Sequence, residues 1–412
     1  MTKPKRGTLT TMHTELDQND TDLGRVISTI LRHDAKVTSY KIALIRSIND
    51  VALSFPDLPA YAGSVAIPIR FLAEFWIAYY WPFVDPEHPI RQGNRRQTNA
   101  GYTSDMEFRR SLTELRVAWE CAAGVRSTPA EGFTVMNDLR LVRKREALPP
   151  SVVAAYRKAV RAISRSIEYP IRYAGPRGEE WSVFPRPETL KDVREQIVSV
   201  PGAGAEDLCL MVPTKLWRSF RALSLWVEAL CLHEWCLYTE LVRQDSDTRT
   251  DRGEIYRLLT ERPGNRQALT WERNHINILL LEGYRFTCPW TDRQITKPDE
   301  YDLDHLVPVS VYPLNELWNL VPSDRHFNQH VKRERLPSEE ALLRAEPLFG
   351  RTYATYGVYK PLATALRQDV ASRFPPPANG GLLDASDLAH LVHRFISQIA
   401  ESRNLARFSS SR

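Results

Sequence analysis

Cysteine is scarce in this chain, and its placement argues against two kinds of site. Only five cysteines occur in 412 residues, and none stands in the paired Cys-x-x-Cys spacing of a structural zinc site. An odd number also argues against a disulfide framework, so we expect a reducing compartment, the cytoplasm. The five are Cys121, Cys209, Cys231, Cys236 and Cys288.

Long uncharged apolar runs are also missing, as is a signal peptide. The most apolar stretch, residues 64–84, contains Arg70, Glu74 and Pro82, which is typical of a buried aromatic-rich helix and not of a membrane span. Residues 1–21 are polar and lack the apolar segment of a signal peptide, so we expect a flexible tail there. The sequence therefore predicts no membrane partner.

Neither sign of charge dominates the chain. The formal net charge is +5, and 43% of the residues are hydrophobic and 25% charged, which is ordinary for a soluble globular protein. A mildly basic balance permits a polyanionic partner without requiring one. The length suggests two or three domains.

Residues 284–338 contain a cluster of side chains suited to catalysis. Asp304 and His305 are adjacent in a segment of alternating apolar and polar residues; Asn319 lies fourteen residues after His305, and Asn328 nine residues after Asn319. Histidine is the side chain best suited to accept a proton near neutral pH. The side-chain oxygens of aspartate and asparagine are hard donors that suit Mg²⁺ or Mn²⁺.

The local pattern around this cluster predicts two strands followed by a helix. Alternation over residues 301–309 favours a strand, and residues 318–322 favour a second one. A helix is expected from about 323 to 333, after a Ser-Asp start signal. Asn328 and Lys332 are four residues apart on this helix and therefore share a face.

This spacing resembles the HNH endonucleases, including the HNH domain of RNA-guided CRISPR effector nucleases. The resemblance covers about 55 residues and includes the exit Leu336-Pro337-Ser338. It implies a ββα-metal fold in which His305 is the general base and Asp304 is a metal ligand. It also implies that Asn319 holds the loop and orients His305, and that Asn328 is the second metal ligand.

The same resemblance implies contacts to phosphate, and the sequence differs from the zinc-bearing HNH relatives at one position. Lys332, Arg325 and Arg333 would hold flanking phosphates as positioning contacts, not as sequence readers. Zinc-bearing relatives have paired cysteines, whereas Thr291 stands here where a second cysteine would follow Cys288. The expected cofactor is therefore Mg²⁺ or Mn²⁺, with no structural zinc.

A basic stripe lies outside the motif. Arg157, Arg161 and Arg165 recur every four residues in a helical segment, which predicts one continuous positive face. Like charges at this spacing are mildly destabilising, so the stripe favours a counter-charge. A nucleic acid or a neighbouring acidic surface would supply one, and a solvated face is the alternative.

The rest of the chain is predicted to be mainly helical, which makes the fold class α+β. Residues 169–173 and 180–184 are predicted to form a hairpin, with residues 208–212 as a third strand of a small sheet. We divide the chain into a tail (1–21), a helical region (22–125), a mixed region with the small sheet and the basic helix (126–250), an HNH nuclease domain (251–345) and a C-terminal helical extension (346–412).

The resemblance implies a metal-dependent endonuclease that hydrolyses phosphodiester bonds. DNA is the expected substrate because most relatives cut DNA, and RNA is not excluded. A role in restriction or phage defence is implied in the same way, with a homodimer or a defence-system partner protein. The alternatives are a silent or gated HNH fold that only binds nucleic acid, and an adaptor built on the N-terminal half.

Overall fold

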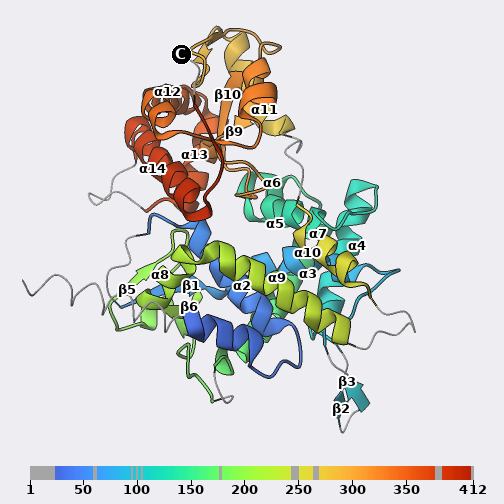
Figure 1. Cartoon of the computed structure of the whole chain (residues 1–412). Coiled ribbons are helices and arrows are strands. Elements are labelled where there is room, and N and C mark those ends of the chain that lie inside the picture. The colour runs from blue at the N-terminus through green and yellow to red at the C-terminus, as the bar shows by residue number, and fades with distance from the viewer. Residues whose placement is uncertain are drawn as a thin grey trace, which may run out of the picture.

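The computed structural model describes residues 24–409 apart from 59–62, 94–95, 99–100, 104, 176–178, 243–249, 263–268 and 376–382. The expected tail at residues 1–21 lies outside the described residues. Helices with a small sheet form the lower half of Figure 1, and the elements from α11 (Thr270–Leu281) onward form the upper half. The predicted α+β class, with a mainly helical N-terminal region, is confirmed.

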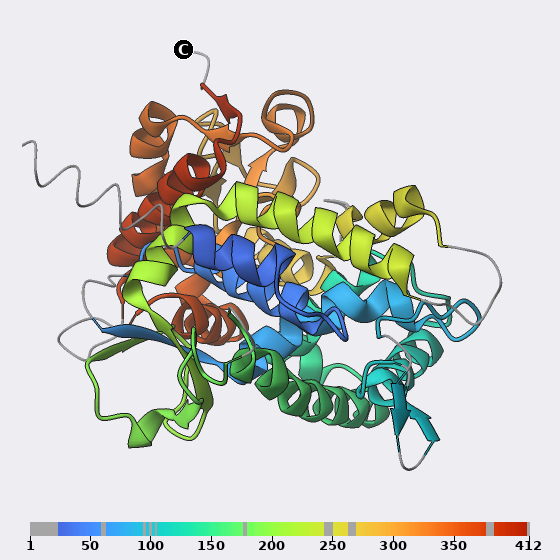
Figure 2. The ribbon, with the colours of Figure 1, turned by 60° about the horizontal axis from the view of Figure 1, so that its bottom comes forward.

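Helix α2 (Tyr40–Ser54) is the centre of the N-terminal half. All of its residues except Asp50 are buried, because α3 (Ile69–Tyr80), α7 (Pro150–Arg172) and α9 (Ser224–Leu241) pack around it. Figure 2 shows α9 running alongside α2.

The apolar stretch at residues 64–84 begins as a buried strand and continues as the buried helix α3. Among the described residues, no helix is long and apolar enough to cross a membrane.

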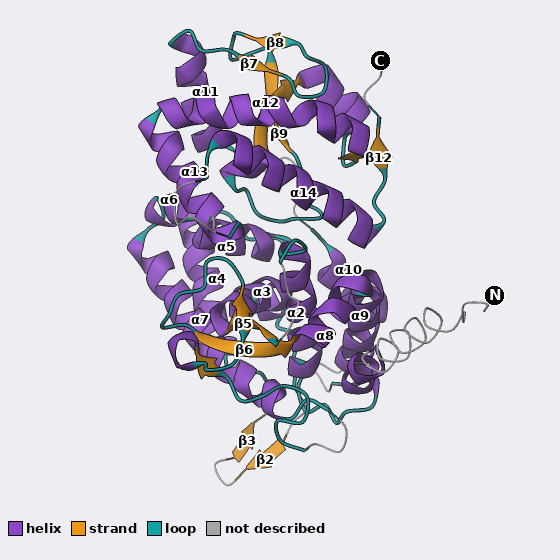
Figure 3. Ribbon diagram, turned by 90° about the vertical axis from the view of Figure 1, so that its left-hand side faces the viewer, coloured by secondary structure: helices purple, strands orange, loops and turns teal. Residues whose placement is uncertain are grey.

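The small sheet has the strand order β4-β6-β1-β5 and lies at one side of the helices (Figure 3). β1 (Ser64–Pro68) is one of its two inner strands, antiparallel to the other, β6 (Leu208–Pro213), and parallel to the edge strand β5 (Ile197–Ser199). β4 (Glu188–Thr189) extends the edge beside β6. The predicted strand at 208–212 is therefore confirmed, and its inner neighbour comes from a segment more than a hundred residues earlier.

The predicted hairpin within residues 169–184 is wrong. Residues 169–172 are the last turn of α7, which continues through Pro170. A proline inside a helix forfeits one backbone hydrogen bond, but Ile163, Ile167 and Ile171 carry the buried face of the helix across it. The stability gained by burying this face exceeds the cost of the proline to the helix.

Shorter elements complete the N-terminal half. Two of them, α5 and α6, lie at its upper edge in Figure 1, next to the other half. The shorter elements are η1 (Trp81–Val84), β2 (Arg96–Thr98), β3 (Gly101–Thr103), α4 (Arg109–Ala123), α5 (Glu131–Arg140), α6 (Val142–Glu146), η3 (Leu190–Asp192), α8 (Thr214–Ala222) and α10 (Arg252–Thr260).

The upper half places a β-hairpin against the C-terminal helices. Tyr353 and Tyr356 of α12 donate hydrogen bonds to backbone carbonyls of Trp318 and Leu320, at 2.6 and 2.9 Å. The last described strand, β12 (Arg407–Phe408), pairs in parallel with β11 (Leu336–Pro337) at the end of the predicted site region. The elements are β7 (Phe286–Thr287), β8 (Gln294–Ile295), β9 (Tyr301–His305), η4 (Leu317–Asn319), β10 (Leu320–Asp324), η5 (Phe327–Lys332), β11 (Leu336–Pro337), α12 (Glu339–Val358), α13 (Lys360–Arg373), α14 (Ala385–Arg403) and β12 (Arg407–Phe408).

Candidate active site

The two predicted strands form an antiparallel hairpin, and the predicted helix follows it. Asp304 of β9 lies opposite Val321 of β10, and His305 lies opposite Leu320. The Asp324 carboxylate accepts a hydrogen bond from the Phe327 backbone N–H at 2.9 Å, which caps the helix start. The helix η5 is a π-helix, a form that occurs mostly as a single turn and often at functional sites.

One open cavity of about 710 Å³ brings the central predicted residues together. Asp304 and His305 at the end of β9 and Asn328 of η5 all line it, so adjacent residues of the strand do reach one pocket. Lys332 and Arg333 line it as well. Sequence reasoning missed four further polar side chains of its wall: Asp302, Arg273, Gln329 and Glu334.

Asp304 is held by an unusually buried ion pair. Its Oδ1 accepts a hydrogen bond from the Lys332 ammonium at 2.8 Å, and its Oδ2 accepts one from the Trp290 indole N–H at 3.1 Å. The same ammonium donates to the His305 backbone carbonyl at 2.7 Å. The side chains of Lys332 and Asp304 are 2% and 4% exposed. Lys332 was expected to contact phosphate, whereas here it neutralises the expected metal ligand.

His305 is oriented by a residue that the sequence did not single out. The Asn315 side-chain oxygen lies 2.6 Å from His305 Nε2. An amide oxygen only accepts, so Nε2 carries the hydrogen and Nδ1 keeps the lone pair that a base needs. Burial lowers the pKa of His305, which keeps the ring neutral at neutral pH.

Asn319 holds the loop that follows the histidine. Its side-chain oxygen accepts from the Val307 backbone N–H at 2.8 Å, and its side-chain N–H donates to the Val307 carbonyl at 3.1 Å. Both residues are fully buried. Asn319 thus fixes the loop, and Asn315 contacts the His305 ring.

Replacing Asn319 with alanine should lower the free energy of unfolding by about 2–4 kcal/mol. The substitution leaves a buried N–H and a buried C=O of Val307 without partners, and each costs about 1–2 kcal/mol, in the lower part of the usual range. Denaturant unfolding measures this loss. The half-exposed Asn328 offers a matched control, since Asn328→Ala should cost less than about 1 kcal/mol. Equal stability of the two variants would contradict the assigned role of Asn319.

Comparison with protein-family models gives two matches. Residues 19–259 match a domain of unknown function, DUF8808, and residues 288–338 match an HNH endonuclease family. The chain belongs to the DUF8808 family. The second match lies on the hairpin, η5 and the cavity described above, and makes this DUF8808 protein an HNH endonuclease, a phosphodiester hydrolase. No curated protein and no solved structure matches the chain.

The residues predicted to bind phosphate lie in two places. Arg333 is exposed at the rim of the HNH cavity, with a positive φ of 51° that is rare for a residue other than glycine. Arg325 is exposed and pairs with Asp302 at 3.3 Å, just outside the lining. Arg157, Arg161 and Arg165 are exposed along α7 in the N-terminal half, away from the cavity (Figure 1).

A buried charge cluster joins α6, α11 and α13. Arg143 of α6 donates to both carboxylate oxygens of Asp369, at 2.8 and 2.7 Å, and to Glu272 at 3.0 Å. Asp369 also accepts from the Leu317 backbone N–H at 2.7 Å. Burial raises the pKa of Asp369 to about 7, Arg143 opposes this shift, and the nearby Glu316 adds to it.

Asp369 should make stability depend on pH. Its pKa lies near 7 in the folded protein and near 3.9 in the unfolded chain. The folded state therefore binds more protons between these values, and the contribution present at low pH is lost as pH rises. We expect the wild type to lose on the order of 2–3 kcal/mol relative to Asp369→Asn between pH 5 and 8. A stability difference that stays constant over this range, measured by denaturant unfolding, would contradict the raised pKa.

Proposed function

We propose that this DUF8808 protein is a metal-dependent endonuclease that cuts DNA, with His305 as general base and Asp304 and Asn328 as metal ligands. The observation that carries the proposal is the shared cavity, which is lined by the oriented imidazole of His305, the Asp304 carboxylate and the Asn328 amide. Since the cavity is open, a polymer can reach these groups without entering the core.

The donor set fits a hard divalent cation. Asp304 and Asn328 offer a carboxylate and an amide oxygen in one cavity, as Mg²⁺ and Mn²⁺ prefer. Asp304 already binds a cation in the form of the Lys332 ammonium. When bound, the metal would stabilise the charge on the phosphoryl group and on the leaving oxygen.

The protein's own residues then perform the proton transfer and the positioning. His305 Nδ1 takes the proton of the attacking water, while Nε2 stays bonded to Asn315. Asn319 keeps the loop after His305 in place. Arg273 and Arg333 line the cavity and would contact the flanking phosphates, and such contacts fix the register of the strand. The resemblance to HNH relatives implies 5′-phosphate products.

The resemblance to HNH relatives supports a substrate and a biological role for this protein. DNA is preferred to RNA because most HNH relatives cut DNA, and a role in restriction or phage defence follows from the same source. One HNH site cuts one strand at a time, so a double-strand cut needs a homodimer or two encounters. Arg157, Arg161 and Arg165 would contact the nucleic-acid backbone outside the cavity.

A gated enzyme is the second candidate, and the Lys332–Asp304 pair favours it. The ammonium holds the carboxylate that the metal needs, so an activating partner or substrate would have to release it. Such an enzyme binds nucleic acid but cuts it only after activation.

Cleavage of labelled single-stranded DNA, duplex DNA and RNA, each with Mg²⁺, Mn²⁺ or EDTA, tests the proposal. We expect the two metals to support cleavage of DNA and EDTA to abolish it. Cleavage of RNA alone would contradict the choice of substrate. Tight, salt-dependent binding without cleavage under either metal would support the gated enzyme instead.

A further inference from the structure

We propose that the DUF8808 domain completes the nuclease site by clamping Asn315, the residue that orients the general base His305. This inference rests on the proposed nuclease function. It assigns a positioning role to two residues of the N-terminal half, Asn137 and Arg143. Neither of them lines the HNH cavity.

Asn315 is held on both sides of its backbone by the N-terminal half. Its N–H donates to the Asn137 side-chain oxygen at 2.6 Å, and its carbonyl accepts from the Arg143 guanidinium at 2.7 Å. Asn137 belongs to α5 and Arg143 to α6, the helices that lie beneath β9 in Figure 1. The backbone of Asn315 is thus fixed from one domain while its side chain contacts His305 in the other.

The clamp is buried and has a second anchor in the C-terminal helices. Asn137 and Asn315 are fully buried, and the Arg143 side chain is 7% exposed. Asp369 of α13 binds Arg143 and also the backbone N–H of Leu317, two residues after Asn315. Charge-assisted bonds in a buried setting are strong and directional. Three separate parts of the chain therefore fix the loop at Asn315.

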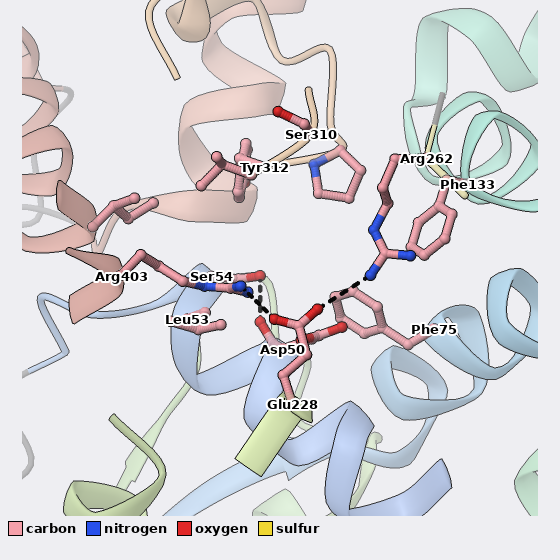
Figure 4. Close-up of a pocket in the computed structure, with 13 residues that line it drawn as sticks. Asp50, Leu53, Ser54, Phe75, Phe133, Glu228, Arg262, Ser310, Tyr312 and Arg403 are labelled. Carbon is pink, nitrogen blue, oxygen red and sulfur yellow. Dashed lines mark hydrogen bonds and ion pairs between the residues drawn. The ribbon is translucent and has the colours of Figure 1, made fainter. Parts of the chain in front are cut away.

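The middle of the same loop also faces the N-terminal half. Ser310 and Tyr312 line a small pocket together with Asp50 of α2 and Glu228 of α9. Figure 4 shows Glu228 between Arg262 and Arg403, across the pocket from Ser310 and Tyr312 of the loop. The middle of the segment between β9 and η4 thus faces the DUF8808 domain across this pocket, and Asn315 near its end is bonded to that domain.

Loss of the clamp should affect the chemical step and leave substrate binding intact. Without its backbone anchor, Asn315 no longer holds Nε2, and the ring can rotate away from the attacking water. A displacement of about 1 Å in a reacting group can cost about 10²-fold in rate. Substrate contacts at the cavity wall do not involve Asn137, so KM should change little.

The test compares Asn137→Ala, Asn315→Ala and the double variant in the full-length chain. We expect kcat to fall about 10- to 100-fold in each single variant, with KM unchanged. Because both residues act through one chain of contacts, the double variant should be no slower than Asn315→Ala. Multiplied losses in the double variant would overturn the proposal.

Asn49→Ala is the matched control. Asn49 is another fully buried asparagine of the same half, and it donates at 3.2 Å to the carbonyl of Ser224 in α9, a residue outside the nuclease loop. It should lose stability as Asn137→Ala does and keep the wild-type kcat. If the control loses kcat to the same extent, the effect of Asn137 is general destabilisation and the clamp is refuted.

A readout without catalysis separates this inference from the nuclease assignment. In ¹⁵N spectra of the histidine rings, the His305 signals are identified by their loss in His305→Ala. We expect one tautomer with hydrogen on Nε2 in the wild type and in Asn49→Ala, and shifted signals in Asn137→Ala. Identical spectra would refute the clamp. Shifted spectra in a chain that cuts no substrate would keep the clamp and refute the proposed function.

Discussion

Replacing His305 with alanine should slow cleavage of DNA by about 10²- to 10⁴-fold, the usual contribution of a positioned general base. The ring is neutral at neutral pH, because burial lowers its pKa, and its Nε2 is fixed by Asn315. No other described histidine lines the HNH cavity except His330, which lies on the exposed side of η5. Single-turnover cleavage under saturating Mg²⁺ measures the loss.

His305→Ala should lower the rate of cleavage without weakening the binding of DNA. His305→Ala removes no group that we assign to phosphate binding, so the affinity for uncut DNA in Ca²⁺ or EDTA should stay within a few-fold of the wild type. A variant that cuts at the wild-type rate would refute the role of His305. A variant that no longer binds DNA would show that the ring serves binding instead.

Replacing Asp304 with alanine should abolish the response to metal and also destabilise the protein. The substitution removes a metal ligand and leaves the buried Lys332 ammonium without its carboxylate. Removing one partner of a buried pair costs about 3–5 kcal/mol, because the other charge stays buried. Denaturant unfolding gives the stability, and an Mg²⁺ titration of cleavage gives the activity.

The double variant Asp304→Ala with Lys332→Met separates the two effects. Replacing the ammonium with an apolar side chain of similar volume should restore much of the lost stability, as replacement of buried ion pairs often does. Activity should stay absent, since the metal ligand is still missing. Recovery of cleavage in the double variant would contradict the assignment of Asp304 as a ligand.

The nuclease motif could be predicted from the sequence because its information is local. Asp304, His305 and Asn328 lie within 25 residues, and the alternation of β9 and the cap at Asp324 are short-range signals. The same holds for Asn319, which binds a backbone group twelve residues away. The structure places all four on one hairpin and the helix that follows it.

The parts that the sequence did not predict depend on distant contacts. Asn137 meets Asn315 across 178 residues, and Arg143 meets Asp369 across 226, so no local pattern marks these pairs. Burial of Lys332 could not be anticipated either, since an isolated lysine on a helix is normally exposed. The hairpin expected near Pro170 failed because tertiary packing outweighed a local break signal.

The most direct test of the account is cleavage of supercoiled plasmid by the full-length chain, with Mg²⁺ or Mn²⁺ and with EDTA. We predict nicked circles that appear before linear DNA in the presence of either metal, because one site cuts one strand at a time. We predict no product with EDTA or with the His305→Ala protein. Cleavage that persists in EDTA, or equal cleavage by His305→Ala, would contradict a metal-dependent HNH site built on His305.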